Sequence, residues 1–462
     1  MTTRGTIVEP QREINVFREC DVVVVGGGPA GWAAAVAAGR AGADTILVER
    51  YGHLGGMATG GLVIQLETLT DGTDFQPIRG VAQEISDRLQ ARDPSTVMVP
   101  PRELFGSRDP KLVDYWRRRH AVRQGTIRNN FTVEPEHLKF LCNEMVEEAH
   151  VKLLLHSWGT QAIVEGNRVI GIVFESKSGR QAILAKVVVD GSGDGDMFAT
   201  AGAEFTTELL PDDIHSTLST DWRFGGVDMD RFERFMTEQP DQFAELMRRA
   251  VVAGGVTRPS RTARDDVAWF NPRVRSFKQT DVEELTWVEM DMRKKMIATW
   301  EFYRKNVPGF ENCWILDTAS QIGTRGSRML KGAHSLTEGE WKAQQQFADA
   351  IGMTPSPTHN VSAETPNIVI PYGTLVPEKM DGLLASGRCI SVDPMMHTML
   401  RLISQAMVTG QAAGVAGAVA AKSGVQPRHV NIQEVQNILL EQDVVLPDYV
   451  ARAIRGVVPP AR

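Results

Sequence analysis

Residues 20–61 read CDVVVVGGGPAGWAAAVAAGRAGADTILVERYGHLGGMATGG, and this stretch decides the fold. Its apolar, β-branched run, residues 21–25, predicts a buried strand of a parallel sheet. Gly26, Gly28 and Gly31 follow with GxGxxG spacing, which allows a sharp turn, a close backbone approach to a pyrophosphate and tight packing of the next helix. Residues 33–38 are small and predict that helix, whose N-terminus offers free N–H groups to phosphate.

A second strand is predicted at residues 45–48, directly before Glu49 and Arg50. Glu49 stands about 20 residues after the glycines, where an acidic side chain accepts hydrogen bonds from a ribose. Strand, glycine turn, small helix, second strand and terminal glutamate come in the order of a dinucleotide site. A glycine-rich turn in some other α/β domain is the alternative interpretation.

Length and composition favour a two-domain globular protein. The chain has 462 residues, 42% hydrophobic and 23% charged, with a formal net charge of −7. That length exceeds one ordinary core, and the mildly acidic balance indicates no nucleic-acid surface. The four cysteines stand far apart without a CxxC pair, which argues against a redox disulfide and against a metal site and fits a reducing cytoplasm.

Two segments could be mistaken for a signal peptide or a membrane span, and neither has the required pattern. Residues 1–17 carry charges and lack the apolar core of a signal peptide. The longest apolar run, residues 406–421, is short and rich in Gly and Ala, which favours a close-packed helix over a membrane span. We therefore expect a cytoplasmic protein with no membrane partner.

The middle of the chain predicts a change of organisation. A helix at 134–149 and a β-meander lead into KVVVDGSGDGD (residues 186–196), a strand followed by a second glycine-rich turn. From residue 205 the alternation of strands and helices fades, and helices are predicted at 229–252 and 282–306. We expect residues 1–204 and 360–462 to form a discontinuous nucleotide-binding domain and residues 205–359 an inserted α+β substrate domain.

Residues 394–421 predict one long helix that carries the candidate chemistry near its start. His397 and Arg401 are four positions apart, so on a helix they share a face. Imidazole titrates near neutral pH, which makes His397 a candidate for proton transfer, and Arg401 is a candidate anchor for a carboxylate or carbonyl. Arg273, in the segment WFNPRVRSF, is a third candidate that a solvated basic loop would equally explain. Arg325 and Arg328 in QIGTRGSR fit a role near a cofactor or between domains.

Four segments resemble the FAD-dependent oxidoreductase family whose FAD domain is of the glutathione-reductase and fumarate-reductase type. These segments are residues 22–63, 180–205, 302–340 and 370–419, the last containing GRCIS and GQAAG. The resemblance implies an α/β fold with a Rossmann-like FAD-binding domain. It also implies FAD as cofactor, bound in an extended conformation.

Under this resemblance, the pyrophosphate and adenosine would lie against Gly26, Gly28, Pro29, Ala30, Gly31, Glu49 and Arg50. The ribityl chain and flavin ring would lie against Gly55, Gly56, Met57, Ala58, Thr59, Gly387 and Arg388. Asp190, Gly193 and Asp194 would lie by the adenine end or the neighbouring sheet. Gln411, Ala412 and Ala413 match a helix that in the family lies under the flavin ring, with its N-terminus towards the ring. Arg388 departs from the Gly-Asp pair that many related flavoproteins carry.

The function predicted is hydride transfer between FAD and a small organic substrate that is carbonyl-bearing, carboxylate-bearing or cyclic, in a dehydrogenase or oxidase. His397 would act as acid or base and Arg401 as anion anchor. Two alternatives remain open: an FAD-dependent reductase of an activated double bond, and a flavin-bearing subunit without its own substrate. The electron acceptor, oxygen or a redox partner, and homo-oligomerisation are also left open.

Overall fold

The strand that opens the glycine-rich stretch lies in the middle of the largest sheet. The computed structural model describes residues 5–210, 217–276 and 278–454. Five strands run parallel in the order β8, β2, β1, β11, β23. Their bounds are β1 Asn15–Val25, β2 Thr45–Val48, β8 Lys152–Leu154, β11 Gly179–Asp190 and β23 Leu383–Ala385. The first half of β11 also pairs with an antiparallel meander, β10 (Arg168–Ser176) and β9 (Trp158–Glu165).

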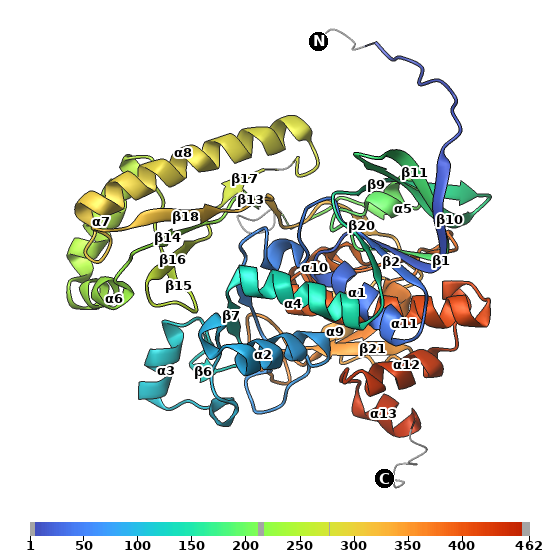
Figure 1. The fold of residues 1–462 in the computed structure, drawn as a ribbon. Coiled ribbons are helices and arrows are strands. Elements are labelled where there is room, and N and C mark those ends of the chain that lie inside the picture. The colour runs from blue at the N-terminus through green and yellow to red at the C-terminus, as the bar shows by residue number, and fades with distance from the viewer. Residues whose placement is uncertain (1–4, 211–216, 277, 455–462) are drawn as a thin grey trace.

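Both faces of this sheet are covered where β1 ends, which explains why residues 22–25 are all apolar rather than alternating with polar residues. Val22 and Val24 pack with α1 (Pro29–Arg40) and α11 (Ile403–Ser423) on one face. Val23 and Val25 pack with the meander and α5 (Asp196–Thr200) on the other. Figure 1 shows α1 and α11 side by side beneath the sheet. The predicted α/β fold with a Rossmann-like nucleotide-binding part is confirmed.

The helix predicted at 394–421 is two helices, so that prediction is wrong. α10 (Pro394–Leu400) ends at Arg401 and Leu402 is extended. α11 begins at Ile403, and its axis makes an angle of 95° with that of α10. No proline or glycine marks the break, so tertiary packing decides it. A Cβ on Gly410 or Gly414 would collide with the backbone carbonyls of α1, which shows that the two helices touch backbone to backbone.

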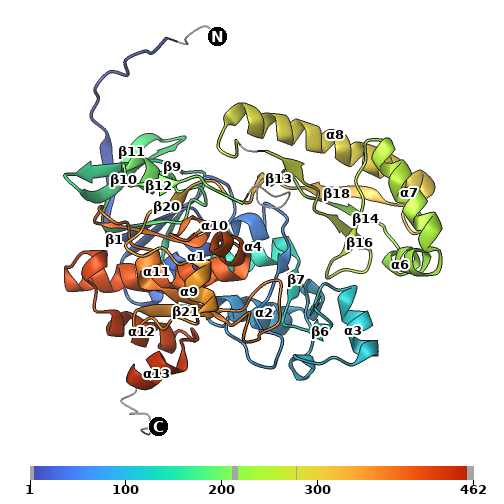
Figure 2. The same ribbon diagram turned by 180° about the vertical axis from the view of Figure 1, so that it is seen from behind.

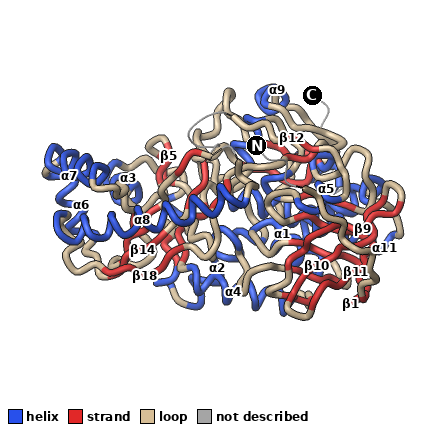
Figure 3. Tube along the Cα trace, turned by 90° about the horizontal axis from the view of Figure 1, so that it is seen from above, coloured by secondary structure: helices blue, strands red, loops and turns tan. Residues whose placement is uncertain are grey.

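A second body of structure is built from the middle of the chain. One four-stranded sheet has the order β15 (Ser260–Arg261), β16 (Val267–Phe270), β14 (Trp222–Gly225), β18 (Trp314–Thr318). α6 (Met229–Glu238), α7 (Pro240–Val252) and α8 (Val282–Asn306) cover it, with a separate apolar core around Phe270 and Tyr303. The single helix expected at 229–252 is interrupted before Pro240, which removes a helical N–H. Figures 2 and 3 show this body at the far side of the molecule from β1 and β10.

A smaller sheet connects the two bodies. It has the order β17 (Val274–Arg275), β13 (Thr217–Ser219), β19 (Gly323–Thr324). Met329, Leu336 and Trp341 are buried in the core of the nucleotide-binding part, whereas residues 218–313 supply the other core. The division at residues 204 and 359 stays a prediction.

The remaining elements surround these two bodies. Residues 65–148 form β3 (Gln65–Leu66), α2 (Val81–Arg92), β4 (Val97–Met98), α3 (Pro110–Arg117), β5 (Val122–Arg123), β6 (Thr126–Ile127), β7 (Phe131–Val133) and α4 (Pro135–Glu148). Later elements are β12 (Phe205–Thr206), β20 (Met329–Leu330), α9 (Glu338–Lys342), β21 (Ala350–Thr354), β22 (Ile368–Pro371), α12 (Ile432–Glu441) and α13 (Asp448–Ile454). Among the described residues, no single helix is long and apolar enough to cross a membrane; α10 and α11 meet that criterion only as a bent pair, and α11 is buried.

Candidate functional site

The glycine turn after β1 exposes bare backbone at the start of α1. Gly26 adopts φ +96°, and a Cβ on Gly31 would collide with the Gly26 carbonyl oxygen, so both positions require glycine. A Cβ on Gly28 would meet nothing within 4 Å. Gly28 is also the N-cap of α1 and gives no side-chain cap, while Pro29 occupies the first helical turn. The N-terminus of α1 is therefore an open cradle for an anion.

Glu49 lies at the end of β2 as predicted, and its carboxylate faces the glycine turn. Its Oε2 accepts from Gly27 N at 2.6 Å and its Oε1 accepts from Tyr51 N at 2.8 Å. Burial raises its pKa even though both hydrogen bonds favour the charged form. Arg50 is exposed and lies over the rings of Tyr51, at 4.8 Å, and Trp158, at 5.9 Å. Both residues thus border the glycine turn from the side of β2.

The loop that follows returns to the same cradle. Gly55 has φ +89°, and a Cβ on Gly56 would stand 2.6 Å from Gly28 Cα. The turn Gly56–Ala58 is fixed by Thr59, whose Oγ1 donates to Leu54 O at 2.5 Å. Met57 Sδ accepts from Gln321 Nε2 at 3.4 Å. The predicted loop residues therefore lie between the pyrophosphate cradle and the connecting sheet.

Asp190 and Asp194 have different roles, and only Asp194 takes part in a charged contact. Both Asp190 oxygens accept from the turn that they close: Oδ1 from Ser192 and Oδ2 from Met197 N and Phe198 N at the start of α5. Burial raises the Asp190 pKa to about 6. With both oxygens used by this turn, Asp190 stands at the end of β11 beside β1, in the neighbouring sheet that was one of its two expected places, and its contact with the cofactor stays a prediction.

Asp194 Oδ1 accepts from Arg388 Nη2 at 2.7 Å and from Ser327 Oγ at 2.6 Å. Burial opposes its charge, but Arg388 and Ser327 outweigh burial and hold the Asp194 pKa below its usual range. The Arg388 guanidinium lies against Gly193, at 3.2 Å from an added Cβ. The Gly387 N–H donates to Thr409, and its Cβ position is 2.9 Å from Ala30 Cβ at the start of α1. The Gly387–Arg388 turn therefore joins the two glycine-rich turns.

Gln411 lies in the middle of α11, away from the helix N-terminus, which is at Ile403. Its Oε1 accepts from Val81 N, and its Nε2 donates to Gln442 O and Oε1. The side chain therefore joins α11 to α2 and to the end of α12. Ala412 and Ala413 are fully buried beside it. The N-terminus of α11 is at Ile403, so these three residues lie within the helix, and the expectation that this N-terminus faces the flavin ring stays a prediction.

The candidate catalytic residues meet where the two bodies adjoin. His397 is 1% exposed and packs against the loop of β19, with its Cε1 2.7 Å from a Cβ on Gly326. Arg401 caps the C-terminus of α10. Burial and then the charges of Arg325, Arg273 and Arg388 lower the Arg401 pKa to about 9. The structure thus brings Arg273, Arg401 and His397 together with Arg325, which sequence reasoning weighed without selecting.

These cations form no salt bridge within the part of the chain that the structure describes. Arg325 Nη2 donates to the neutral Asn271 Oδ1 at 3.1 Å, and Arg325 Nε and Arg401 Nε have no partner. Burial and the charge of Arg273 lower the Arg325 pKa to about 10. Arg273 itself is exposed. The cluster of Arg273, Arg325 and Arg401, which we call the arginine cluster, is therefore electrostatically prepared for an anion.

Sequence reasoning missed Asp221, the acidic residue beside the arginine cluster. It lies between β13 and β14 and is 0% exposed. Burial raises its pKa well above the ordinary value, although Arg325 and Arg273 act in the opposite direction. Only the charges of arginines from distant segments mark it out, and no local pattern reports that folding brings these charges near. Arg328, by contrast, donates to Asp194 O at 2.8 Å and to Asp196 at 3.0 Å in the turn after β11, and its role between domains stays a prediction.

The residues present fit FAD. The α1 cradle, the open Cβ direction of Gly28 and the glycine loop at Gly55 and Gly56 admit a pyrophosphate and a flat ring system. Glu49 would hold the ribose and Gly387–Arg388 would border the ribityl chain. Bound FAD would supply the hydride acceptor or donor next to Met57.

Comparison with known proteins agrees with this interpretation. The family model described as FAD dependent oxidoreductase matches residues 21–439. Digeranylgeranylglycerophospholipid reductase 1 of Methanopyrus kandleri is 28% identical over 198 residues, 42% of this chain and 45% of that protein. Soluble pyridine nucleotide transhydrogenase of Mycobacterium bovis is 28% identical over 131 residues, 27% of this chain and 25% of that protein. The chain spans less than half the length of these curated relatives.

Solved structures also resemble this one at low sequence identity. The geranylgeranyl bacteriochlorophyll reductase-like protein of Thermoplasma acidophilum has a TM-score of 0.45 at 15% identity, over 92% of this chain and 84% of that one. The flavin-dependent brominase Bmp2 has a TM-score of 0.47 at 14% identity, over the same shares of the two chains. The family match spans both glycine turns, the connecting sheet and α11. The chain belongs to the FAD dependent oxidoreductase family, and its cofactor is FAD.

Proposed function

We propose that this flavoenzyme oxidises a small organic substrate bearing a carboxylate or carbonyl group, as a dehydrogenase or oxidase. The arginine cluster near the loop of residues 55–59 carries the proposal. Its three cations form no salt bridge with any residue that the structure describes. Burial and then the charges of neighbouring arginines lower the pKa of Arg325 and Arg401, and a bound anion would favour their charged form. A substrate anion is the group that such a site lacks.

Each residue has a distinct task in this proposal. Arg401 and Arg325 hold the substrate anion from the two adjoining bodies, and Arg273 adds charge from the solvent side. His397 exchanges the proton of the substrate group that is oxidised. Burial raises the pKa of Asp221, so this carboxyl competes less with the substrate for the arginine charges. FAD, when bound, would supply the hydride acceptor.

A reductase of an activated double bond is the second candidate. The curated relatives named as reductases favour it, although they match less than half of this chain. An arginine cluster would serve that reaction as well, because the same groups stabilise the substrate anion in either direction. The two candidates differ in which compound bleaches the flavin.

Anaerobic titration of the purified yellow protein separates the candidates. Bleaching of flavin absorbance by an organic hydroxy or amino acid supports the dehydrogenase or oxidase, and re-oxidation by air then distinguishes those two. Bleaching by NADH or NADPH alone supports the reductase. A flavin that neither kind of donor reduces would support the non-catalytic subunit and overturn the proposal.

His397→Ala tests the proton-transfer role. We expect the variant to retain FAD and to reduce it about 10²-fold more slowly in stopped-flow measurements with substrate, because general acid–base catalysis supplies that order of rate. His334→Ala is the matched control, since His334 contacts Glu340 in another part of the fold. Equal reduction rates in wild type and His397→Ala would remove His397 from the mechanism.

A further inference from the structure

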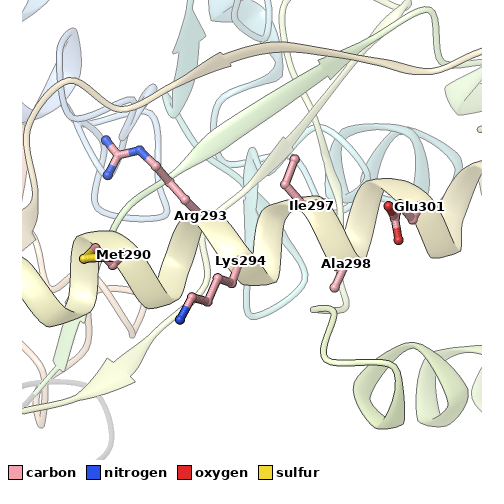
Figure 4. Close-up of a pocket in the computed structure, with 6 residues that line it drawn as sticks. All are labelled: Met290, Arg293, Lys294, Ile297, Ala298 and Glu301. Carbon is pink, nitrogen blue, oxygen red and sulfur yellow. The ribbon is translucent and has the colours of Figure 1, made fainter.

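The longest helix, α8, carries apolar side chains on its outer face. Its inner face, including Val288, Met292 and Met296, is buried in the core of the second body. On the outer face Trp287 is 51% exposed, Met290 60% and Ile297 41%. Figure 1 shows α8 along the edge of the molecule, and Figure 4 shows Met290, Lys294, Ile297, Ala298 and Glu301 along one stretch of it. Contiguous exposed apolar surface of this kind marks an interaction site.

The end of α7 extends this surface. Val251 is 59% exposed and Val252 89% exposed. The turn that follows them reaches α8, since a Cβ on Gly254 would lie 3.8 Å from Ala298 Cβ. We define the α8 patch as Val251, Val252, Trp287, Met290, Lys294, Ile297, Ala298 and Glu301.

The spacing along α8 is that of a helix–helix seam. Trp287, Met290, Lys294, Ile297 and Glu301 are separated by three, four, three and four residues, which keeps them on one stripe. A second helix can pack along such a stripe without a change of register.

Two charges of the stripe form no salt bridge with any residue that the structure describes. The neighbouring Arg293 pairs with Glu289 at 2.8 Å, and Lys295 pairs with Asp291 at 2.7 Å. Four residues before Lys294 stands Met290, which offers no charge, and among the described residues neither Lys294 nor Glu301 forms a salt bridge. The stripe thus displays one unpaired cation and one unpaired anion, two helical turns apart.

We propose that the α8 patch is a homodimer interface, in which α8 of a second copy packs antiparallel along the same stripe. A twofold axis between Ile297 and Ala298 places these two side chains against each other across the axis. The same axis brings Lys294 of each copy to Glu301 of the other, so both unpaired charges are matched twice. An isologous contact of this kind is closed, which limits the assembly to two copies.

The size of the surface suits a dimer. A helix of 25 residues is about 37 Å long. Together with the end of α7, such a length can supply the roughly 800 Å² per partner that stable interfaces bury. The proposed dimer does not depend on which substrate the enzyme takes. The α8 patch lies on the outer face of the second body, whereas the cradle at the start of α1 lies in the nucleotide-binding part.

Sedimentation velocity of the FAD-loaded protein tests the interface. We expect a dimer for the wild type, and for Ile297→Asp a dissociation constant raised about 10²-fold, because a buried central anchor is replaced by a charge. Val282→Asp, on the same helix but outside the patch, is the control and should remain dimeric. Retained flavin absorbance shows that each variant is folded.

A charge reversal makes the test specific for the antiparallel pairing. Lys294→Glu alone and Glu301→Lys alone should each weaken the dimer, and the double variant should restore it, since the two exchanged charges would again meet as opposite pairs across the axis. A monomeric wild type, or a dimer that Ile297→Asp leaves unchanged, would overturn the proposal. So would a monomer that co-sediments with phosphatidylglycerol vesicles through Ile297, because that result assigns the patch to a lipid surface.

Discussion

The nucleotide cradle and the arginine cluster are built from different parts of the chain. The cradle consists of glycine backbone, a helix N-terminus and the Glu49 carboxylate, which accepts from two main-chain N–H groups, all within one continuous stretch. The arginine cluster consists of long side chains from segments far apart in sequence, with buried nitrogen atoms that lack partners. Backbone sites are stabilised by the fold itself, whereas the arginine cluster costs stability and is maintained for its charge.

The largest effects are expected from substitutions of two glycines in the cradle. Gly31 allows close packing against the protein, whereas Gly28 leaves room for the cofactor. Gly31→Ala places a methyl group against the Gly26 carbonyl and should destabilise the flavin-free protein by about 1–3 kcal/mol. Gly28→Ala meets no protein atom and should leave the melting temperature of the flavin-free protein unchanged. Both variants should lose FAD, measured as flavin absorbance per protein after loading. Full flavin content in Gly28→Ala would show that the pyrophosphate does not approach this residue.

The next effect tests whether the arginine cluster trades stability for function. Arg401→Met removes a largely buried cation without a salt bridge, so the melting temperature should rise while flavin reduction by substrate slows about 10²-fold. Arg102→Met, on an exposed turn, is the control and should change neither quantity. A lower melting temperature in Arg401→Met would mean that Arg401 stabilises the fold.

The pH dependence of anion binding tests whether the charge of Arg401 holds the anion. The Arg401 pKa is about 9 in the ligand-free protein, so the cation is present below that pH and lost above it. The dissociation constant of oxalate, followed by the flavin spectrum, should be constant in the neutral range and rise by up to about tenfold per pH unit above pH 9. Arg401→Met should remove this dependence. A dissociation constant that is constant through pH 10 in the wild type and unchanged in Arg401→Met would exclude Arg401 as the anion ligand.

The smallest effect concerns Asp221. Burial raises its folded-state pKa, whereas in the unfolded chain it ionises near about 4, so its cost to stability grows as pH rises above that value. Asp221→Asn should therefore melt at the wild-type temperature near pH 4 and at a higher temperature at pH 7. A lower melting temperature at pH 7 would mean that Asp221 is ionised and stabilises Arg325 and Arg273.

Sequence reasoning reached the cradle because its signal is local. Glycine spacing, a β-branched run and Glu49 at the end of a strand determine the conformation within one stretch, and the family resemblance added Gly55, Gly56 and Gly387. The break before Ile403 and the engagement of Gln411 with α2 were missed, because both depend on packing between helices. Asp221 was missed for the same reason: only folding brings it to Arg325 and Arg273.

The backbone contact between α1 and α11 has a consequence for synthesis on the ribosome. Gly410 and Gly414 lie against the carbonyls of Ala30 and Ala34, near the opposite end of the chain. During synthesis α1 therefore has no partner for this face until α11 has emerged from the ribosome. Because contacts this distant in sequence form late, the cofactor cradle is completed only after residues 403–423 have been synthesised. A nascent chain that stops before Ile403 carries every residue of the glycine turn but lacks the helix that fixes it.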